Sequence, residues 1–516
     1  MPLKRQEFMF KTKALVSTAV LLVCASAQAQ NAPNVSQVLM FSTVTNTNVG
    51  PQFSQSSLFS ANTSGVLPNA LFTVYTGNVS ATADLNQPKN YSFANISPLN
   101  SAISSSIGLA LSLIPVASPT SAVILKTDPT TGAELPVNST LGPVFTERAE
   151  TIGKGKFFIG ISHQDLHFNS IDGQDLNGLS ILYKGGDKSA FQNGSGQNAT
   201  QPATFNLGLD VRLTQDLAFL TYGLLNHLDV SVGLPMVHSA VSATAYNGVI
   251  YSGAGLGANG NNCWCQNTFS PGTFRLQEAF IGRSSLSKSG IGDVLVRVKG
   301  EVLERPSAVV AIGTDLRLPS GDANNYLGTG TTSVKPFVAV SLYTKPLANG
   351  LVFSPHFNVG WQFSGSSILG GAIMGSNQTA TMQNGDKVSY LGAPLAITEG
   401  KLPDVLAWSA GAELALGRRN TIAVDILGNQ IGWINAAQVV KVGSASGFSQ
   451  TSPFSATTAT GMVDGGRSSF GQYSGSFGYK VRLAGSLVLT LNALVRLDHN
   501  GLTARIVPLY GLSYTF

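Results

Sequence analysis

The feature that most constrains this chain is a two-residue period of apolar side chains in its last stretch. Counting back from the end in steps of two meets apolar or aromatic residues only: Phe516, Tyr514, Leu512, Tyr510, Pro508, Ile506, Ala504 and Leu502. The intervening positions include hydroxyls and a charge, at Thr515, Ser513, Thr503 and Arg505. A period of two indicates a β-strand, and about fifteen residues is at least twice the usual strand length. This segment alone fits both a soluble edge strand and a strand that faces lipid.

The same period recurs through the C-terminal three-quarters of the chain and predicts an all-β fold. Twelve runs carry it, near residues 155–169, 205–226, 228–246, 290–304, 307–318, 333–345, 350–364, 404–417, 419–433, 467–483, 485–498 and 502–516. Such runs are longer than the strands of a soluble sandwich. In the first run the apolar face moves from Phe157, Ile159 and Ile161 to Leu166 and Phe168, which predicts a β-bulge.

The connections between these runs alternate between short and long. The short ones are "LLNHL", "LERPS", "KPLANG", "GRR" and "AGS", and the long ones span about 170–204, 247–289, 319–332, 365–403 and 434–466; only "DHNG" is a tight turn where a long loop is due. Short turns on one rim and long loops on the other are typical of an outer-membrane barrel. The predicted fold class is therefore a transmembrane antiparallel β-barrel of twelve strands (range ten to fourteen), with Phe516 at the periplasmic rim.

The N-terminal 29 residues have the pattern of a secretory signal peptide. Lys4, Arg5, Lys11 and Lys13 precede the apolar "ALVSTAVLLVCASA", and small residues allow cleavage after Ala27 or Ala29. Cys24 would suggest a lipoprotein, but Val23 stands where a small residue is expected. Beyond this segment no apolar run approaches the ~20 residues that a spanning helix needs, so a membrane location requires a closed β-barrel. We therefore expect the mature protein in the outer membrane of a Gram-negative-type bacterium.

Composition excludes some functions. The net charge is +5, of which the four basic residues of the signal segment against Glu7 account for +3, so the mature chain is close to neutral. A near-neutral chain lacks the basic footprint of a nucleic-acid-binding protein. Cys263 and Cys265 in "NNCWCQN" either form a strained local disulfide in a loop or remain thiols. A zinc site would need two further ligands that nothing nearby supplies, so neither a metal nor a cofactor is predicted.

Two stretches resemble a known family. Gly292-Asp293, Leu318-Pro319-Ser320-Gly321-Asp322 and Leu327-Gly328-Thr329-Gly330 occur in the order seen in the bacterial outer-membrane family labelled "putative MetA-pathway of phenol degradation", and the stretch from Thr221 to Val237 resembles that family's preceding hairpin. The likeness covers roughly residues 205–516. It implies a channel-like barrel associated with aromatic or other apolar small molecules, and it brings no catalytic motif.

The last residues of the sequence resemble a second known pattern, a terminal assembly signal. Tyr510, Leu512, Tyr514 and Phe516 resemble the terminal signal by which outer-membrane proteins are handed to the barrel assembly machinery. The last strand must also pair with the first, because a barrel in lipid leaves no open edge. The expected partners are therefore outer-membrane lipids, the assembly machinery and a small apolar solute, while the oligomeric state is open.

Residues 30–150 lie outside the family likeness. They are rich in Ser, Thr, Asn and Pro, with one apolar island from Ile103 to Leu125. The segment is expected to fold into the lumen as a hatch, which is similar to the plan of long-chain fatty-acid transporter type barrels, because an apolar patch needs cover. The alternative is that the segment is a flexible periplasmic extension. In both cases residues 151–516 are predicted to form the barrel.

Charged residues on the polar faces of the strands are predicted to face the lumen. They are Asp210, Arg212, Asp216, Asp293, Arg297, Lys299, Glu301, Asp315, Arg317, Glu413, Asp425, Lys480, Arg482, Arg496 and Arg505. Their mixed signs favour a paired network that props a narrow lumen over a pathway for polar solutes, since interior charges need partners.

Three functions remain open from the sequence. The first is an outer-membrane channel for small hydrophobic or aromatic molecules, and the second is a barrel that anchors binding loops. The third is a lipid hydrolase with a Ser–His pair on the barrel's outside, for which His238 is the only candidate histidine. His163 and His167 are about 13 Å apart by strand rise, too far to share a metal. No GxSxG motif occurs, so an enzyme is not expected.

Overall fold

The structure is a computed structural model that describes residues 43–46, 72–75, 97–115, 125–127, 134–136, 140–184, 202–250, 276–277, 282–344, 351–371, 373–381, 387–417, 419–445 and 456–516. The chain divides into two units, Met1–Pro33 and Asn34–Phe516, and the second contains all of the described residues. The signal peptide predicted for residues 1–29, and the loop with Cys263 and Cys265, lie outside the described residues.

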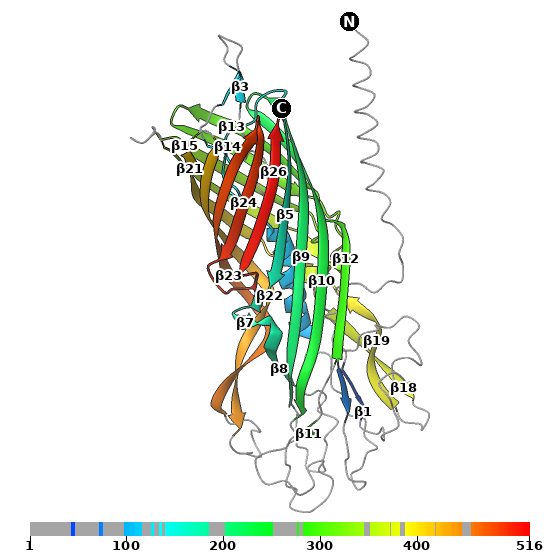
Figure 1. Ribbon diagram of the computed structural model, residues 1–516. Coiled ribbons are helices and arrows are strands. Elements are labelled where there is room, and N and C mark those ends of the chain that lie inside the picture. Colours follow the sequence, from blue (N-terminus) through cyan, green and yellow to red (C-terminus); the bar gives the residue numbers. More distant parts are fainter. Residues whose placement is uncertain are drawn as a thin grey trace, which may run out of the picture. The chain divides into compact units, whose positions relative to one another are not determined.

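Twelve strand positions in the described residues form one closed antiparallel ring (Figure 1). In ring order they are β5 (Phe157–Phe168), β9 (Pro202–Leu225), β10 (Leu228–Ile250), β12 (Gly282–Ile291) with β13 (Leu295–Arg305), β14 (Ala308–Arg317), β15 (Ser333–Leu342), β16 (Val352–Ser364), β21 (Val405–Leu416), β22 (Asn420–Ala445), β23 (Ala456–Ala484), β24 (Leu487–Arg496) and β26 (Ile506–Thr515). Both β12 and β13 pair with β10, so these two segments share one position. The predicted twelve-stranded transmembrane barrel is confirmed.

Smaller elements lie in the N-terminal part and in the connections. They are β1 (Thr43–Asn46), β2 (Phe72–Tyr75), α3 (Ser97–Leu113), β3 (Leu125–Thr127), β4 (Glu134–Pro136), β6 (Ser170–Ile171), β7 (Gln174–Asp175), η3 (Leu176–Gly178), β8 (Leu179–Lys184), β11 (Leu276–Gln277), η5 (Ala323–Asn325), β17 (Ser366–Ser367), η6 (Ile368–Gly370), β18 (Ile373–Thr381), β19 (Lys387–Ile397), β20 (Gly400–Lys401) and β25 (Leu502–Thr503). None of the helices in the described residues is long and apolar enough to cross a membrane.

The ring closes at the last residue of the chain. Strand β26 pairs with β5 from Leu509 opposite Gln164 to Thr515 opposite Phe158. Beyond that pairing, Phe157 N donates to Phe516 O at 2.8 Å and Phe516 N donates to Phe157 O at 2.9 Å. The two aromatic rings are stacked, with centroids 5.6 Å apart. No edge is left between first and last strand, which is what a barrel in lipid requires.

The outer face of the barrel carries an apolar band. The exposed side chains include Ile506, Tyr510 and Tyr514 of β26 and the following Phe516, and Trp361 of β16 is 46 % exposed. The side chains between them point inward, for example buried Val507 and Leu509. Exposed apolar side chains on a closed barrel form the lipid-facing girdle of a membrane protein.

Along β5 the outer face changes from apolar to polar without any break in the strand. Phe157, Ile159 and Ile161 point outward, and the next outward residues are His163, Asp165 and His167. The pairing of β5 with β9 runs without a shift from Phe157 to Phe168, so the predicted bulge is wrong. The physical reason is a change of medium: the strand leaves the lipid-facing girdle, while its inner face turns apolar at Leu166 and Phe168. We call this part of the wall, residues 162–168, 207–216 and 238–244, the sleeve.

The same inversion corrects the predicted orientation of three charges on β9. The side chains of Asp210, Arg212 and Asp216 are 49 %, 53 % and 67 % exposed, because they lie on the outside of the sleeve rather than in the lumen. There His163 Nδ1 lies 2.7 Å from Asp216 Oδ1, and His167 Nε2 lies 3.2 Å from Asp210 Oδ1. The apolar residues between them, such as Leu213, are buried on the inner face.

Candidate functional site

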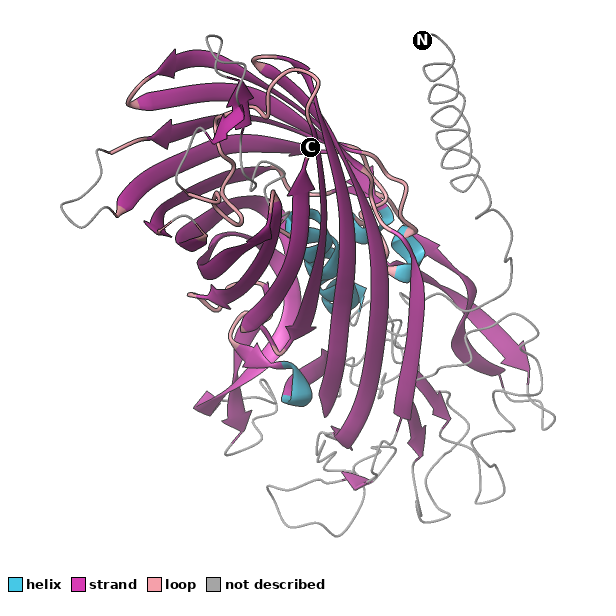
Figure 2. Ribbon diagram, turned by 45° about the horizontal axis from the view of Figure 1, so that its top comes forward, coloured by secondary structure: helices cyan, strands magenta, loops and turns pink. Residues whose placement is uncertain are grey.

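A helix occupies the inside of the barrel. Figure 2 shows α3 within the ring of strands. Ile103, Ile107 and Leu111 follow one another at four-residue spacing, which places them on one face of the helix, and all three are buried. Five serines of α3, Ser101, Ser104, Ser105, Ser106 and Ser112, are buried as well. Two of them return a hydrogen bond to the helix backbone, Ser106 Oγ to Ala102 O at 2.8 Å and Ser112 Oγ to Leu109 O at 2.9 Å. The helix can therefore be enclosed on several sides.

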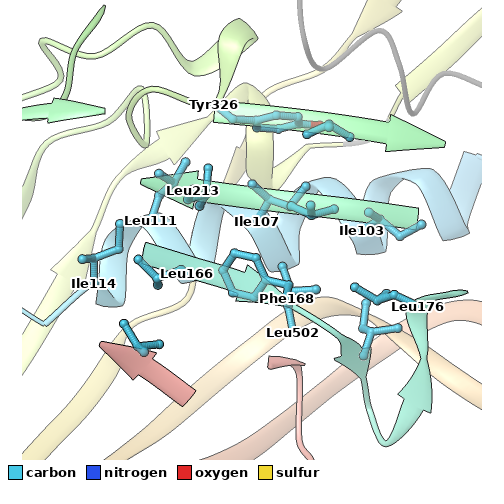
Figure 3. Close-up of a cluster of buried hydrophobic side chains, with 14 of the residues drawn as sticks. Ile103, Ile107, Leu111, Ile114, Leu166, Phe168, Leu176, Leu213, Tyr326 and Leu502 are labelled. Atoms are coloured by element: carbon cyan, nitrogen blue, oxygen red, sulfur yellow. The ribbon is translucent and has the colours of Figure 1, made fainter. Parts of the chain in front are cut away.

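The apolar face of α3 packs against the inner face of the sleeve (Figure 3). We call the buried side chains gathered there the interior cluster. It includes Ile103, Ile107, Leu111, Ile114, Leu166, Phe168, Leu176, Leu209, Val211, Leu213, Val241, Tyr326, Leu369, Leu402 and Leu502. Its members come from α3, from strands of the wall and from the connections on the long-loop rim. This part of the lumen is therefore lined by apolar groups.

The C-terminal end of α3 is held by the barrel wall. Arg317 Nη1 of β14 donates to Leu111 O at 3.0 Å, and Gln164 Nε2 of β5 donates to Pro115 O at 2.8 Å. A cation at the C-terminus of a helix is favourable because the last carbonyls carry partial negative charge. Further along, Ser105 Oγ donates to Leu369 O at 2.9 Å. Three polar contacts thus position a helix that is otherwise in apolar surroundings.

A second segment crosses the interior near the rim of short turns. Residues 140–152, which we call the strap, are buried throughout. Their backbone amides donate to side chains of successive wall strands: Leu141 N to Thr421 Oγ1, Gly142 N to Glu413 Oε2, Glu147 N to Asn358 Oδ1, Ala149 N to Ser341 Oγ and Ile152 N to Asp229 Oδ2. These partners belong to β22, β21, β16, β15 and β10 in turn, so the strap follows the inner wall around the barrel.

Ion pairs bind the strap to the wall. Glu147 of the strap accepts from Arg297 Nη1 at 2.6 Å and from Lys299 Nζ at 2.8 Å. Arg297 also forms a bidentate pair with Asp315, at 2.6 Å and 2.9 Å. On the other side of the strap, Arg148 Nη2 lies 2.9 Å from Glu413 Oε2. These side chains are almost fully buried, so each charge depends on its partner.

A buried histidine lies next to the same network. His356 Nε2 is 2.7 Å from Asp425 Oδ1, and His356 Nδ1 is 3.7 Å from Glu413 Oε1. The hydroxyl of Thr146 in the strap donates to the same Asp425 oxygen at 3.0 Å. Sequence reasoning identified neither His356 nor the charges of the strap as site residues. The signal for the strap was present as "TERAE", a charged run directly before the first strand.

The charges that were predicted to face the lumen divide into groups. Asp293, Arg297, Lys299, Asp315, Glu413, Asp425 and Lys480 are buried; Glu301, Arg317, Arg482 and Arg496 are partly buried; Arg505 precedes β26 and is exposed; and Asp210, Arg212 and Asp216 lie outside, as described above. The structure brings Arg297, Lys299 and Asp315 together around the strap. Arg496 is set apart, with Asp498 as its partner at 3.5 Å.

Asp293 has a different role, because it folds a loop into the barrel. Its Oδ1 accepts from Gly321 N at 3.0 Å, and its Oδ2 accepts from Thr329 N at 2.7 Å and Thr329 Oγ1 at 2.6 Å. A Cβ on Gly328 would lie 2.2 Å from Asp293 Oδ1, so a side chain cannot be accommodated there. These are the residues of the family resemblance, and their shared property is this clamp on residues 318–332.

The clamp carries an aromatic ring into the interior cluster. Tyr326 has a positive φ of 53° and is fully buried beside α3. Burial raises the pKa of its phenol well above the ordinary value. Through Tyr326, the loop therefore contacts the apolar face of α3 directly (Figure 3).

Replacing Asp293 with Ala should release this loop. Three donors lose a charged acceptor, and hydrogen bonds to charged groups are worth about 1.5–3 kcal/mol each. We expect residues 318–332 to lose most of their protection in hydrogen-exchange mass spectrometry. The control is Asp322→Ala in the same loop, which removes the N-cap of η5 and costs about 1 kcal/mol. Equal protection in both variants would show that Asp293 does not hold the loop.

Two other clusters bring potentially reactive side chains together. His227, Glu301 and Glu304 bring three ligand atoms within 4.8 Å of one another, but His227 Nδ1 and Glu301 Oε2 are 2.9 Å apart and form an ion pair or hydrogen bond directly. On the outer face, His238 Nδ1 lies 2.7 Å from Ser289 Oγ. These two residues are register partners on β10 and β12, which by itself brings short side chains into contact. A hydrolase would also need a group that orients the imidazole.

Comparisons with solved structures find proteins of low sequence identity. An outer membrane channel from Pseudomonas putida F1 has 10 % identity and a TM-score of 0.36, covering 71 % of this chain and 98 % of that one. The Ralstonia pickettii toluene transporter TbuX has 10 % identity and a TM-score of 0.28, covering 70 % and 90 %. A Pseudomonas aeruginosa FadL homologue has 7 % identity and a TM-score of 0.28, covering 70 % and 89 %.

Comparison with curated proteins finds no match. Comparison with family models finds one for residues 189–390, a stretch that contains the Asp293 clamp and both sides of the loop it folds. The resemblance seen in the sequence is thereby confirmed over these residues, which match the model of the family described as "Putative MetA-pathway of phenol degradation".

Proposed function

We propose that this protein is an outer-membrane channel for small apolar molecules, in which α3 and the strap form an internal hatch. The observation that carries the proposal is the apolar lining around α3. An apolar interior disfavours charged solutes, because removing a charge from water without a partner is costly, and it favours small uncharged ones. The matched family's description, which concerns phenol degradation, supports aromatic molecules as cargo.

The hatch has two parts with different interactions. Helix α3 fills the interior next to the sleeve mainly through apolar contacts, whereas the strap is held by ion pairs and hydrogen bonds. Apolar contacts are non-directional and can be exchanged for contacts with a solute, so α3 is the part that we expect to shift. The strap is the fixed part.

The location follows from the sequence and the fold together. We infer that residues 1–29 direct export and are removed, that the barrel assembly machinery recognises the strand ending at Phe516, and that the rim with the short turns faces the periplasm. The lipid-facing girdle supports this placement. The N-terminal segment would then begin in the periplasm. A hatch that enters the lumen through the rim with the short turns requires this.

Uptake by whole cells tests the proposal. Cells that make the protein should accumulate toluene faster than cells without it, while uptake of the anion benzoate should not change, because the apolar part of the lumen excludes charge. Purified protein in planar bilayers should show low ion conductance. A large conductance with no effect on toluene would indicate a general porin. Neither effect would indicate a barrel that serves as an anchor for its loops.

A further inference from the structure

Three polar side chains form a patch on the inner wall, beside the C-terminal end of α3. They are Gln164 of β5, Gln215 of β9 and Ser239 of β10, which lie on three adjacent strands and are 0 %, 5 % and 0 % exposed. Gln164 and Gln215 are register partners, and Ser239 is the partner of Leu213, the inward residue next to Gln215. We call these three residues the glutamine patch.

Each member of the patch has a buried polar atom without a hydrogen-bond partner among the described residues: Gln164 Oε1, Gln215 Oε1 and Ser239 Oγ. The amide of Gln164 has a defined orientation, because its Nε2 donates to Pro115 O at 2.8 Å. Its oxygen must therefore point elsewhere. Buried polar atoms without hydrogen-bond partners destabilise the state in which they are covered, and three of them on neighbouring strands are unusual in a packed interior.

The surroundings of the patch are apolar on one side. The next inward residues along the same strands are Leu166, Leu213 and Val241, all members of the interior cluster. Figure 3 shows Leu166 and Leu213 close to Leu111 and Ile114, at the end of α3 that Pro115 follows. Two amide oxygens that can only accept, next to a hydroxyl and an apolar surface, match a molecule that has an apolar body and a hydrogen-bond donor at one end.

We propose that the glutamine patch is a binding station for uncharged apolar molecules that carry a hydroxyl or a similar donor, such as a phenol. This rests on the proposed function, since the patch becomes accessible only when the end of α3 shifts. The amide oxygens of Gln164 and Gln215 can only accept, so the solute must donate. A donor-bearing solute satisfies groups that the closed state leaves unpaired, whereas a plain hydrocarbon leaves them unpaired still.

The test compares solutes that share a ring and differ in the donor. In cells that make the full-length protein, saturable uptake of phenol should exceed that of toluene by about tenfold, equivalent to ~1.4 kcal/mol. Anisole, in which a methyl group replaces the hydroxyl hydrogen, should behave like toluene. Uptake of anisole at the rate of phenol overturns the proposal without any variant. Absence of protein-dependent uptake for all three solutes overturns the proposed function as well.

Variants locate the preference. The double variant Gln215→Met and Ser239→Ala should lower phenol uptake to the level of toluene and leave toluene unchanged, because the shape of the two side chains is nearly kept while their polar groups are lost. The matched control is Gln362→Met on β16, also buried but with Nε2 donating to Ser364 Oγ at 3.4 Å. A phenol preference that survives in the double variant, or that is lost equally in the control, overturns the assignment. Heat-dependent gel mobility confirms that each variant folds.

Discussion

Deletion of residues 34–152 is expected to convert the barrel into an open pore whose single-channel conductance is higher by an order of magnitude or more. The deletion removes both parts of the hatch, α3 and the strap, and leaves β5 to β26 with their inward charges facing water. A deletion that ends at residue 140 should have a smaller effect, because the strap stays in place through partners such as Glu413 and Lys299. Planar-bilayer recording of the purified variants measures the difference.

A matched deletion of residues 34–96 serves as the control, because it spares both α3 and the strap. Its conductance should equal that of the intact protein. Equal conductance after all three deletions would show that residues 97–152 do not limit the passage of ions. The proposed hatch would then have to be abandoned, even though the barrel itself would stand.

Replacement of Arg297 by Met is expected to cause the largest loss of stability among single substitutions at the strap. It leaves Glu147 and Asp315 buried with a missing partner, and breaking a buried pair in this way typically costs about 3–5 kcal/mol. The urea concentration at which the heat-modifiable band is lost should fall accordingly. A double variant with Glu147→Gln should recover part of the loss, because Asp315 keeps Lys335 at 3.1 Å.

The control for this substitution is Lys335→Met. Lys335 contacts the same Asp315, but its side chain is 31 % exposed, and partly exposed pairs contribute about 1 kcal/mol or less. The two variants remove the same charge from neighbouring positions, so they differ in burial and in the contact with the strap. Equal losses of stability would contradict a special role for the pair between Arg297 and Glu147.

The barrel could be predicted from the sequence because alternation and short turns are local signals. All twelve predicted runs correspond to strand positions, and the turns at "LLNHL" and "AGS" join neighbouring strands. The far ends of β9, β22 and β23 could not be predicted. Residues 456–466 of β23 are rich in Thr and Gly, and residues 434–445 of β22 lack a regular apolar alternation, so the pairing of these ends rests on backbone hydrogen bonds that no local pattern indicates.

Alternation of apolar and polar side chains along a strand shows which residues share a face of the sheet. It does not show whether that face contacts lipid, water or the interior of the barrel. On β9 the apolar set Leu209, Val211 and Leu213 would face lipid if the whole strand crossed the girdle. In the sleeve it faces α3 instead, because the outward positions there are taken by exposed polar side chains and the inside is filled by the interior cluster. The assignment of Asp210 therefore failed, whereas that of Asp315, within the girdle, matches its burial.

The hatch contacts could not be predicted because their partners are distant in sequence. Arg148 and Glu413 are separated by 265 positions, and nothing in the local pattern of either residue indicates the other. The Asp293 clamp could be predicted in part. Its residues were recognised as a shared pattern, but the reason for the glycines is the close approach of Gly328 to Gly321 and to the carboxylate, which only the folded loop reveals.

The position of the strap has a consequence for the order of assembly. It runs along the inside of the wall and continues through Gly153 into the strand that pairs with the chain's last residues. If the ring closed first, α3 and the strap would have to be threaded through it afterwards, and folding chains avoid threading. We therefore expect the sheet to curl around a strap that is already bound to β22, β21 and β16, so that β26 meets β5 last. Since these contacts join residues far apart in sequence, that final zipping is the slow event.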